Sequence, residues 1–373
     1  EELRKSLFET QTIDTFVHNG RGVFGSDFGS CAFVIHKAHL SDYRGSFRRL
    51  FEKPGSVASN EELDARFRTV KTYTPSNADF AKIPGSPVAY WASHQVRAAF
   101  AGAASLGSIC AVRKGMDTAD NDTFLRRWFE VSVSKMGLGC TDCEDAKQSH
   151  KKWFPYKKGG EFRKWYGNNE YVVNWFNDGA ELALWGQGSI RSKDLFFKQS
   201  VTWTATSSSF FGVRHADVGF ISDAKGSACY PNHNDHFWIL AFLTTPMVDA
   251  CLRILNPSIE YQAGNIATLP VAENINHDEE FKGRATEFAV SAVELARTDW
   301  DSFETSWNFQ VLPAIQHKTA TLRHSHEVAD AGCLARFARM KEIETENNRL
   351  FIDAYGLQDE ISPEVSDNQV TLY

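Results

Sequence analysis

The sequence predicts an α/β protein that ends in a helical region, and three observations carry that prediction. The first residues follow a helix–strand–loop–strand order, which suits one edge of an α/β sheet. The middle of the chain alternates short strand-like runs with aromatic loops, and the last third has helical periodicity. With 373 residues, 42% of them hydrophobic, the chain is long enough for two or three domains and a sizeable core.

The N-terminal elements follow directly from the hydrophobic pattern. Residues 1–9 have the pattern of a helix, and residues 12–19 alternate apolar and polar side chains as a strand does. Residues 20–30 form a glycine-rich loop, and residues 31–38 form a short, nearly continuous apolar strand. A Ser or Asn before the acidic residues of 59–67 predicts a helix start, because such side chains cap the free N–H groups there.

Three further elements are expected between residues 83 and 255. Residues 83–91 form a Pro/Gly connector, and a helix is expected from there through Phe100. Residues 120–133 have the pattern of a strand with its turn. The apolar residues 236–255 are expected to form a buried helix, or two helices broken at Pro246, because proline removes a helical hydrogen bond.

The last third is expected to be helical. Residues 278–304 and 314–355 are rich in Ala, Glu and Arg, and Gly356 is a normal C-terminal stop. No run of 18 apolar residues occurs, so no transmembrane helix is expected. The first residues are charged, unlike a signal peptide, and the lack of an initiator Met leaves open that the chain is a fragment.

The charge distribution is uneven. The formal net charge is −7, but residues 151–230 hold eleven Lys/Arg against seven Asp/Glu. Residues 231–373 hold ten Lys/Arg against twenty-two Asp/Glu. A basic middle inside an acidic chain predicts one local electropositive face, with the acidic helical region contacting protein rather than DNA.

Residues 151–175, the basic–aromatic segment, are the candidate nucleic-acid face. They combine six Lys or Arg with eight aromatic residues and three glycines. Cations would neutralise phosphates, rings would stack on bases or fix loops, and the two adjacent Asn amides would read an adenine edge. The predicted DNA-binding residues of the segment are Lys151, Lys152, Lys157, Lys158, Arg163, Lys164, Trp165, Tyr166, Asn168 and Asn169. Further along the chain they are Arg191, Lys193, Lys198 and Arg214.

A structural alternative stands beside this prediction. The segment also suits a twisted β-meander whose aromatic rings are core and whose lysines are solvated. In that case the recognition surface would have to lie around residues 191–214. Composition favours the core role for any single ring and nucleic acid for the segment as a whole.

Metal ligation is not expected. Cys140 and Cys143 have CxxC spacing, but a structural zinc site needs four ligands. Cys229, His233 and His236 could complete such a site, and nothing in the sequence brings them to the pair. The seven scattered cysteines are expected to be reduced thiols.

Long strings of the sequence resemble the C-terminal portion of the PglX family, the adenine-specific DNA methyltransferases of BREX phage-defence systems. The resemblance covers nearly the whole chain, and its most specific parts are residues 151–179 and 255–270. Fused methyltransferase–restriction enzymes are similar more loosely. The strings are, in order, TIDTFVHNGRGVFGSDFGSCAFVIHK, IPGSPVAYWAS, GMDTADNDTFLRRWFEV, KKWFPYKKGGEFRKWYGNNEYVVNWFNDG, RILNPSIEYQAGNIATLPV and NNRLFIDAYGLQDEISPEV.

The resemblance implies methyl transfer from S-adenosylmethionine to N6 of an adenine flipped out of duplex DNA. The family's [ND]PP[YF] loop and Gly-containing cofactor motif are absent from these 373 residues. No catalytic residue is therefore expected in this chain, most of the cofactor site is expected upstream, and the chain alone is expected to be inactive.

The resemblance also implies an organisation. Residues 1–110 would be the end of a Rossmann-like methyltransferase sheet with a connector, residues 111–272 an α+β target-recognition domain, and residues 273–373 a helical spacer or tail. The string at 255–270 would be a helix end, a Pro turn and a strand ending at Pro270. Expected partners are double-stranded DNA, other BREX proteins and phage DNA-mimic inhibitors, in a cytoplasmic, nucleoid-associated setting without a membrane. A non-catalytic DNA-specificity module and a part of a fused restriction–methylation enzyme are the alternatives.

Overall fold

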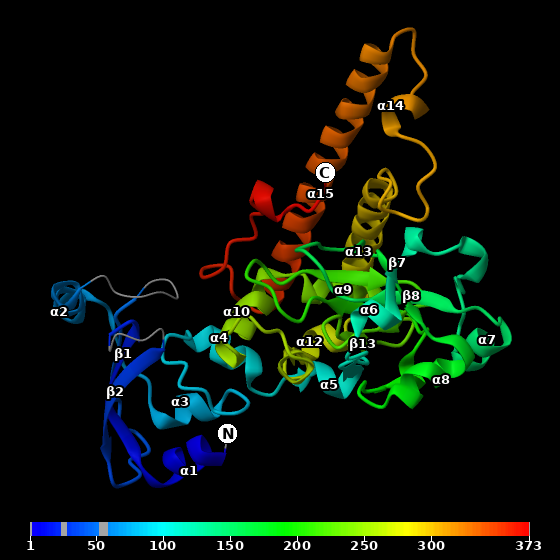
Figure 1. Ribbon diagram of the computed structural model, residues 1–373. Helices are drawn as coiled ribbons and strands as arrows, with labels where there is room; N and C mark the ends of the chain where they lie inside the picture. Colours follow the sequence, from blue (N-terminus) through cyan, green and yellow to red (C-terminus); the bar gives the residue numbers. More distant parts are fainter. Residues whose placement is uncertain (1, 24–27, 52–58, 373) are drawn as a thin grey trace. The chain divides into compact units, whose positions relative to one another are not determined.

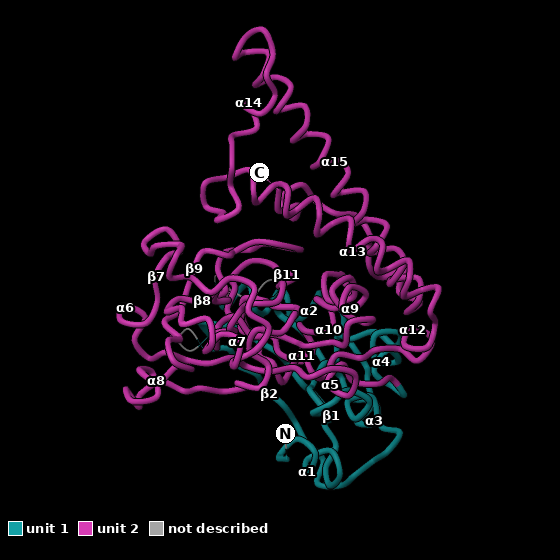
Figure 2. The backbone as a smooth tube through the Cα atoms, turned by 90° about the vertical axis from the view of Figure 1, so that its right-hand side faces the viewer, with its two compact units in different colours: residues 1–102 teal, residues 103–373 magenta. Residues whose placement is uncertain are grey.

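The computed structural model describes residues 2–23, 28–51 and 59–372, which divide into two compact units (Figures 1 and 2). Unit 1 comprises residues 1–102 and unit 2 comprises residues 103–373. The expected domain boundaries after residues 110 and 272 stay predictions. The middle of the glycine-rich loop expected at 20–30 lies outside the described residues.

Unit 1 contains a mixed four-stranded sheet of order β2-β1-β3-β4. β1 (Thr12–Arg21) pairs antiparallel with β2 (Gly29–His36) and parallel with β3 (Ser46–Arg49). β3 pairs antiparallel with β4 (Thr72–Tyr73). Both strands expected from the hydrophobic pattern are confirmed. The sheet holds one parallel pair, so the α/β class holds while a Rossmann-like arrangement is not confirmed.

The helices of unit 1 begin where the sequence offers caps. The Ser59 hydroxyl accepts the N–H of Glu62 at 3.2 Å and starts α2, as predicted. Ser93 caps α4 in the same way and places its start after the Pro/Gly connector. The helices of unit 1 are α1 (Glu2–Thr10), α2 (Asn60–Thr69), α3 (Asn77–Ala81) and α4 (His94–Phe100).

Aromatic rings form the core of unit 1. The ring of Phe8 on α1 stacks on Phe80 with centroids 5.3 Å apart. Phe47 on β3 lies 5.5 Å from Phe80 and 5.5 Å from Tyr90. Because each such ring buries a large apolar area, a few of them fix α1 and α3 on the sheet.

Unit 2 is built on two four-stranded sheets and one two-stranded sheet. Their strand orders are β11-β10-β13-β6, β12-β8-β9-β7 and β14-β5. The strands are β5 (Ala104–Ser105), β6 (Ala111–Arg113), β7 (Leu125–Arg127), β8 (Trp153–Lys157), β9 (Tyr171–Asn174), β10 (Ser200–Trp203), β11 (Val213–Ala216), β12 (Ile221–Ser222), β13 (Ala228–Tyr230) and β14 (Pro270–Val271).

Helices connect these sheets and form most of the C-terminal third. The α-helices of unit 2 are α5 (Leu106–Ile109), α6 (Asn121–Phe124), α7 (Cys143–Gln148), α8 (Phe176–Trp185), α9 (His236–Leu243), α10 (Pro246–Leu255), α11 (Ala263–Ala267), α12 (Glu273–Asn276), α13 (Glu279–Trp300), α14 (Pro313–Gln316) and α15 (Leu322–Ala354). Short 3-10 turns cover Trp128–Glu130, Val133–Lys135, Lys193–Leu195 and Asp367–Gln369.

The apolar segment 236–255 is two helices broken at Pro246, which confirms the second of the two expectations. Thr245 caps α10, and Pro246 occupies its first turn, where a missing N–H costs nothing. No single helix of the described ranges is long and apolar enough to cross a bilayer, and α9 and α10 meet at 69°. Their side chains are mostly buried in unit 2.

The long helices α13 and α15 pack against each other and against α9 and α10 (Figures 1 and 2). Residues 273–373 lie in unit 2 together with the sheets. Gly356 ends α15 with φ +65°, and the Leu357 N–H bonds to the Ile352 carbonyl at 3.0 Å. This left-handed stop is the one that the sequence predicted.

Two sequence expectations are corrected. Residues 120–133 are not one strand: they hold α6, the three-residue β7 and a 3-10 turn, because Asp120 caps a helical turn first. The strand expected to end at Pro270 instead begins there as β14, and α11 precedes it. The Pro270 strand is short because it pairs only with the two residues of β5.

Candidate nucleic-acid interface

Strands β8 and β9 frame the basic–aromatic segment, and they bury its rings. All five residues of β8 are buried, and successive side chains point to opposite faces. Phe154 and Tyr156 enter one core cluster with Trp175, while Trp153 packs against Met136 on the other face. Six of the eight aromatic residues of the segment are buried, and Phe162 and Tyr171 are partly buried, so most of the rings have the core role that the β-meander alternative gave them.

A single carboxylate on α15 holds two neighbouring side chains of the segment. The Lys164 ammonium lies 2.5 Å from one oxygen of Glu344, and the Trp165 indole N–H donates to the other at 2.7 Å. All three residues are buried. A buried charge needs a partner, so this contact satisfies Lys164 inside the protein across 180 positions of sequence.

Arg163 is held by helix α13. Its guanidinium lies 3.6 Å from the Asp299 carboxylate, and both side chains are nearly inaccessible to solvent. The same group lies over the Trp300 ring, 5.0 Å from its centroid. Together with the Lys164 contact, this pair ties the loop between β8 and β9 to both long helices.

A chain of polar contacts continues from Tyr166. Arg297 lies over the Tyr166 ring at 4.5 Å and donates to both oxygens of Asp217 at 2.9 and 3.0 Å. Burial alone would raise the pKa of Asp217, but hydrogen bonds and charge from His215 and Arg297 hold it below its usual range. His215 meets His236 at 2.8 Å, and burial lowers the pKa of His236 to about 3.

Two further predicted cations are buried. Burial, and then the charge of Arg214, lower the pKa of Lys157 to about 7. The Lys157 ammonium donates to the Asn169 carbonyl oxygen at 2.5 Å and lies 4.1 Å from the Phe220 ring centroid. Burial also lowers the pKa of Arg214 to about 10, and its guanidinium donates to the Arg163 carbonyl at 3.3 Å.

These contacts correct part of the sequence prediction. The eight predicted residues with buried side chains are Lys157, Arg163, Lys164, Trp165, Tyr166, Asn168, Asn169 and Arg214. Their polar groups face other parts of the protein, so in this structure they do not present themselves to DNA. The six with solvent access are Lys151, Lys152, Lys158, Arg191, Lys193 and Lys198, and for these DNA binding stays a prediction.

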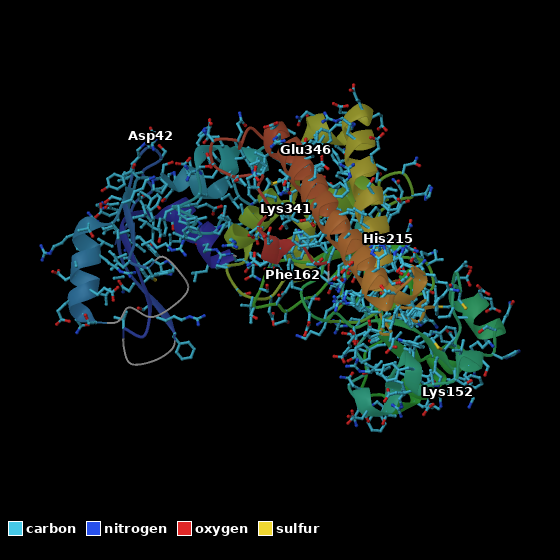
Figure 3. All side chains as sticks on the ribbon, turned by 90° about the horizontal axis from the view of Figure 1, so that it is seen from above. Asp42, Lys152, Phe162, His215, Lys341 and Glu346 are labelled. Carbon is cyan, nitrogen blue, oxygen red and sulfur yellow. The ribbon has the colours of Figure 1, made fainter. Side chains whose placement is uncertain are left out.

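The accessible lysines of the segment lie at opposite ends of β8. Lys151 and Lys152 precede the strand and Lys158 follows it. A strand rises about 3.4 Å per residue, so these ends are roughly 17 Å apart. Figure 3 shows Lys152 at one edge of unit 2, away from Phe162 in the loop that follows β8. The expected single basic face is therefore divided in two.

Loops gather at the end where β8 finishes, and we call them the loop rim. The Ala205 N–H donates to the Lys225 carbonyl at 2.8 Å, and the Thr204 hydroxyl donates to the Gly160 carbonyl at 3.1 Å. The rim thus joins loops from both four-stranded sheets. It comprises residues 117–121, 158–161, 204–209 and 223–227.

Lys158 connects the loop at residues 117–121 to the rest of the rim. Its ammonium donates to the Asn121 side-chain oxygen at 3.1 Å and to Asp223 at 3.0 Å. The Tyr156 hydroxyl donates to the same Asp223 oxygen at 2.6 Å, and burial, then the charge of Asp223, raise the pKa of that phenol. Lys158 is therefore oriented by a buried carboxylate and keeps only part of its donor capacity for a ligand.

Glycine is required where the rim loops meet. A Cβ on Gly226 would lie 1.9 Å from the Lys157 carbonyl oxygen, closer than any real contact. Gly159 has φ +95°, a backbone conformation that L side chains rarely adopt. These two positions explain why the rim backbones approach one another so closely.

Sequence reasoning missed most of the rim. Lys225 is exposed, and its ammonium lies 3.4 Å from the Thr206 hydroxyl. The sequence did carry a signal for both loops. Residues 204–209, between two strands, are rich in Ser and Thr. In residues 223–227, Lys225 stands directly before Gly226, a residue typical of turns. Neither stretch is basic enough to stand out by composition.

The cations predicted further along the chain, at residues 191–214, are only partly accessible to a ligand. The Lys193 ammonium pairs with Asp178 at 2.5 Å, and Arg191 donates to the Ser189 hydroxyl at 2.9 Å. Lys198 is exposed. Because Arg214 is buried, the alternative recognition surface around residues 191–214 keeps its accessible cations at Arg191, Lys193 and Lys198.

The CxxC pair does not form part of a larger ligand group. Burial raises the pKa of the Cys140 thiol and raises that of Cys143 to about 11, so both are protonated at neutral pH. Cys229 lies in β13 within the core, and His236 faces His215. Among the described residues, no group of three His, Cys, Asp or Glu side chains is placed to hold a metal ion.

A site for a cofactor such as S-adenosylmethionine usually has a volume of about 300–1,000 Å³. The cavity beside Phe162 and Phe210 holds only about 90 Å³. The groove at the start of α13 holds about 390 Å³, but polar side chains and one glycine line it, with no ring or apolar wall for an adenine. Neither concavity fits S-adenosylmethionine.

The chain is similar in sequence to two adenine-specific methyltransferases. No family model matches it. It is 35% identical over 387 residues to the adenine-specific methyltransferase PglX of Lacticaseibacillus casei (strain Zhang), covering 96% of this chain and 31% of that protein. It is 36% identical over 327 residues to the adenine-specific methyltransferase BrxX of Escherichia coli O9:H4 (strain HS), covering 85% and 25%.

Two solved structures are also similar. The type IIL restriction-modification enzyme MmeI in complex with DNA is 11% identical, with a TM-score of 0.47 over 95% of this chain and 44% of that one. The type IIG restriction endonuclease BpuSI is 9% identical, with a TM-score of 0.29 over 95% and 45%. The chain spans less than a third of the length of its curated relatives. On sequence identity, it is homologous to the C-terminal part of the PglX and BrxX adenine-specific methyltransferases.

Proposed function

We propose that unit 2 recognises the DNA sequence for an adenine-specific, S-adenosylmethionine-dependent DNA methyltransferase. The observation that carries the proposal is the loop rim, in which polar loops from two sheets are fastened together beside exposed Lys225. The homology to adenine-specific methyltransferases supplies the reaction class. The chemistry itself would be supplied by the cofactor bound elsewhere in the whole protein.

The rim has the side-chain types that reading a DNA site requires. Thr206 and the serines that follow it offer hydroxyls that both donate and accept hydrogen bonds to base edges. Asn121 offers an amide N–H₂ group, which can donate to an acceptor on a base edge, while its oxygen is held by Lys158. Lys225 and Lys158 offer positive charge for phosphates, and Gly160 lets the backbone approach.

The buried network gives these loops a fixed position. Glu344 and Asp299 hold the loop that begins at the rim, and Asp223 holds Lys158. Groups fixed before binding lose less conformational entropy when DNA docks. The buried cations that sequence reasoning assigned to DNA therefore act indirectly, by positioning the rim.

The wider role follows from the relatives. We infer that the whole protein marks adenines of host DNA in BREX phage defence, with other BREX proteins and phage DNA-mimic inhibitors as partners. A nuclease-fused parent and a specificity module without methyl transfer are the competing outcomes. The test therefore uses the full-length gene rather than this chain alone.

The experiment is methylation-aware sequencing of DNA from cells with and without the full-length gene. The gene should add N6-methyladenine at one short, non-palindromic site. A rim variant, Lys225→Ala with Thr206→Ala, should lose methylation at that site, whereas Lys318→Ala, an exposed lysine outside the rim, should keep it. Unchanged methylation in a folded rim variant would remove the rim from recognition, and no methylation with the intact gene would favour the specificity module.

A further inference from the structure

An isoleucine beside the loop rim is exposed although hydrogen bonds hold its backbone, and we propose that it packs against the C5-methyl group of a thymine in the bound DNA site. The residue is Ile259, in the segment 256–262 that joins α10 to α11. The inference rests on the proposed function, because it concerns the same DNA. It adds a base contact that the polar side chains of the rim do not supply.

The segment pairs with the rim as a short antiparallel ladder. Glu260 lies opposite Thr206, and the Ser207 N–H donates to the Ile259 carbonyl at 3.0 Å. Side chains alternate along such a ladder, so Glu260 and Thr206 point to one face while Ile259 and Ser207 point to the other. Ile259 therefore lies directly beside a rim residue, and the Glu260 carboxylate points away from the face that carries it.

Further hydrogen bonds fix the backbone around Ile259. The Tyr261 N–H donates to the Ala205 carbonyl at 2.7 Å. The Asn256 side-chain amide donates to the Glu260 carbonyl at 2.8 Å. Because these bonds hold the residues that follow Ile259, the segment cannot turn that side chain into the core without breaking them.

The Ile259 side chain is 58% exposed and has polar neighbours. The Ser209 N–H donates to the Ser207 hydroxyl at 3.2 Å, which folds the serine loop back beside the ladder. Ser208 and Ser209 are exposed. Single exposed apolar side chains are common on protein surfaces, and this one differs in standing on a fixed ladder among the hydroxyl groups of the rim. A ligand that covers it gains free energy, because apolar surface leaves water.

Thymine is the base that this combination fits. In the major groove thymine presents the acceptor O4 and a methyl group, whereas adenine, guanine and cytosine present only donors and acceptors. A serine hydroxyl can donate to O4, and isoleucine can cover the methyl group. A two-stranded ribbon such as this ladder fits into the major groove. A site of adenine methylation always contains a thymine, opposite the target adenine, so the expected ligand is present.

The test measures binding of the full-length protein to a duplex that carries its methylation site, with single thymines replaced in turn by deoxyuridine. This replacement removes the C5-methyl group and keeps the base pair. With the wild type, one replacement should weaken binding about fourfold, the factor expected for one buried methyl group. Ile259→Ser should weaken binding to the thymine duplex by at least that factor, and deoxyuridine at the same position should cause no further loss.

The matched control is Ile315→Ser, which changes an isoleucine 53% exposed on α14, outside the rim. This variant should bind the thymine duplex as tightly as the wild type and should keep the fourfold discrimination against deoxyuridine. The scan with the wild type needs no variant at all. A wild type that binds every deoxyuridine duplex as tightly as the thymine duplex overturns the contact by itself.

The outcomes separate the thymine contact from the proposed function. If Ile259→Ser keeps the discrimination of the wild type, another residue covers the methyl group and the inference is overturned, while loss of affinity in the rim variant Lys225→Ala with Thr206→Ala still supports the rim. If Ile259→Ser loses the discrimination and the rim variant binds normally, the thymine contact is supported and Lys225 and Thr206 are not needed for recognition. A wild-type protein that binds no duplex overturns both.

Discussion

Removing Glu344 should destabilise unit 2 more than most single substitutions can, because this carboxylate satisfies two buried groups at once. In Glu344→Met, the Lys164 ammonium and the Trp165 indole N–H both lose their acceptor. An uncompensated buried charge costs about 3–5 kcal/mol. The orphaned indole N–H adds about 1–3 kcal/mol. Against a usual stability of about 5–15 kcal/mol, this loss brings unit 2 close to unfolding.

Lys164→Met should cost about 3–5 kcal/mol by itself, because it leaves Glu344 charged and buried. The double variant removes both charges and leaves only the indole N–H unsatisfied. It should therefore be more stable than the sum of the singles predicts, by at least about 3 kcal/mol, because each single variant leaves one buried charge uncompensated. Since both side chains are buried, solvent screening does not reduce this expectation.

The assay is urea unfolding followed by tryptophan fluorescence, with each free energy taken from the midpoint and slope of the transition. The argument is refuted if the destabilisations of the two single variants sum to that of the double variant within about 0.5 kcal/mol. It is also refuted if Glu344→Met lowers the free energy of unfolding by less than about 1 kcal/mol. DNA binding by the folded double variant gives a second check. Its salt slope should equal that of the wild type, and a fall of about one unit would show that Lys164 contacts a phosphate after all.

Three further predictions concern buried or partly buried groups. Lys157 has a folded-state pKa of about 7 and an ordinary unfolded value of 10.5, so the unfolded chain binds more protons between these values. Stability should therefore rise with pH across that window by up to about 1.4 kcal/mol per pH unit, and Lys157→Met should flatten the rise measured by urea unfolding at several pH values. Gly226→Ala should lower the melting temperature and weaken DNA binding, because its Cβ would meet the Lys157 carbonyl, whereas Gly264→Ala, with open space around it, should do neither. Cys143, whose thiol has a pKa of about 11, should react slowly with iodoacetamide at pH 8, and exposed Cys31 should react first by mass spectrometry; equal rates would contradict the burial.

Local features of the fold could be predicted from the sequence. The cap at Ser59, the break at Pro246 and the stop at Gly356 all lie where the sequence places them. Each depends on the covalent structure of one residue and its near neighbours: a hydroxyl that accepts an N–H, a ring that removes one, or a missing Cβ that permits positive φ. The strands of unit 1 followed from alternation for the same reason.

The candidate site could be predicted only in part. Composition identified residues 151–175 as unusual, and the motifs in them identified the family, because both are properties of the string itself. Composition did not distinguish cations that face solvent from cations that face a carboxylate. The segment's DNA-binding prediction covered the accessible Lys151, Lys152 and Lys158 together with seven residues whose side chains are buried.

The sequence by itself determined the family, the positions of the local starts and stops, and which segment carries the unusual charge. The tertiary structure decided which of those charges are available. Lys164 and Arg163 are buried because Glu344 and Asp299 reach them from helices that come more than a hundred residues later. A lysine without such a partner either stays in water or, like Lys157, is buried with a lowered pKa, because the desolvation of its charge is costly. Whether a partner arrives depends on how distant segments pack, and no local pattern around the lysine records it.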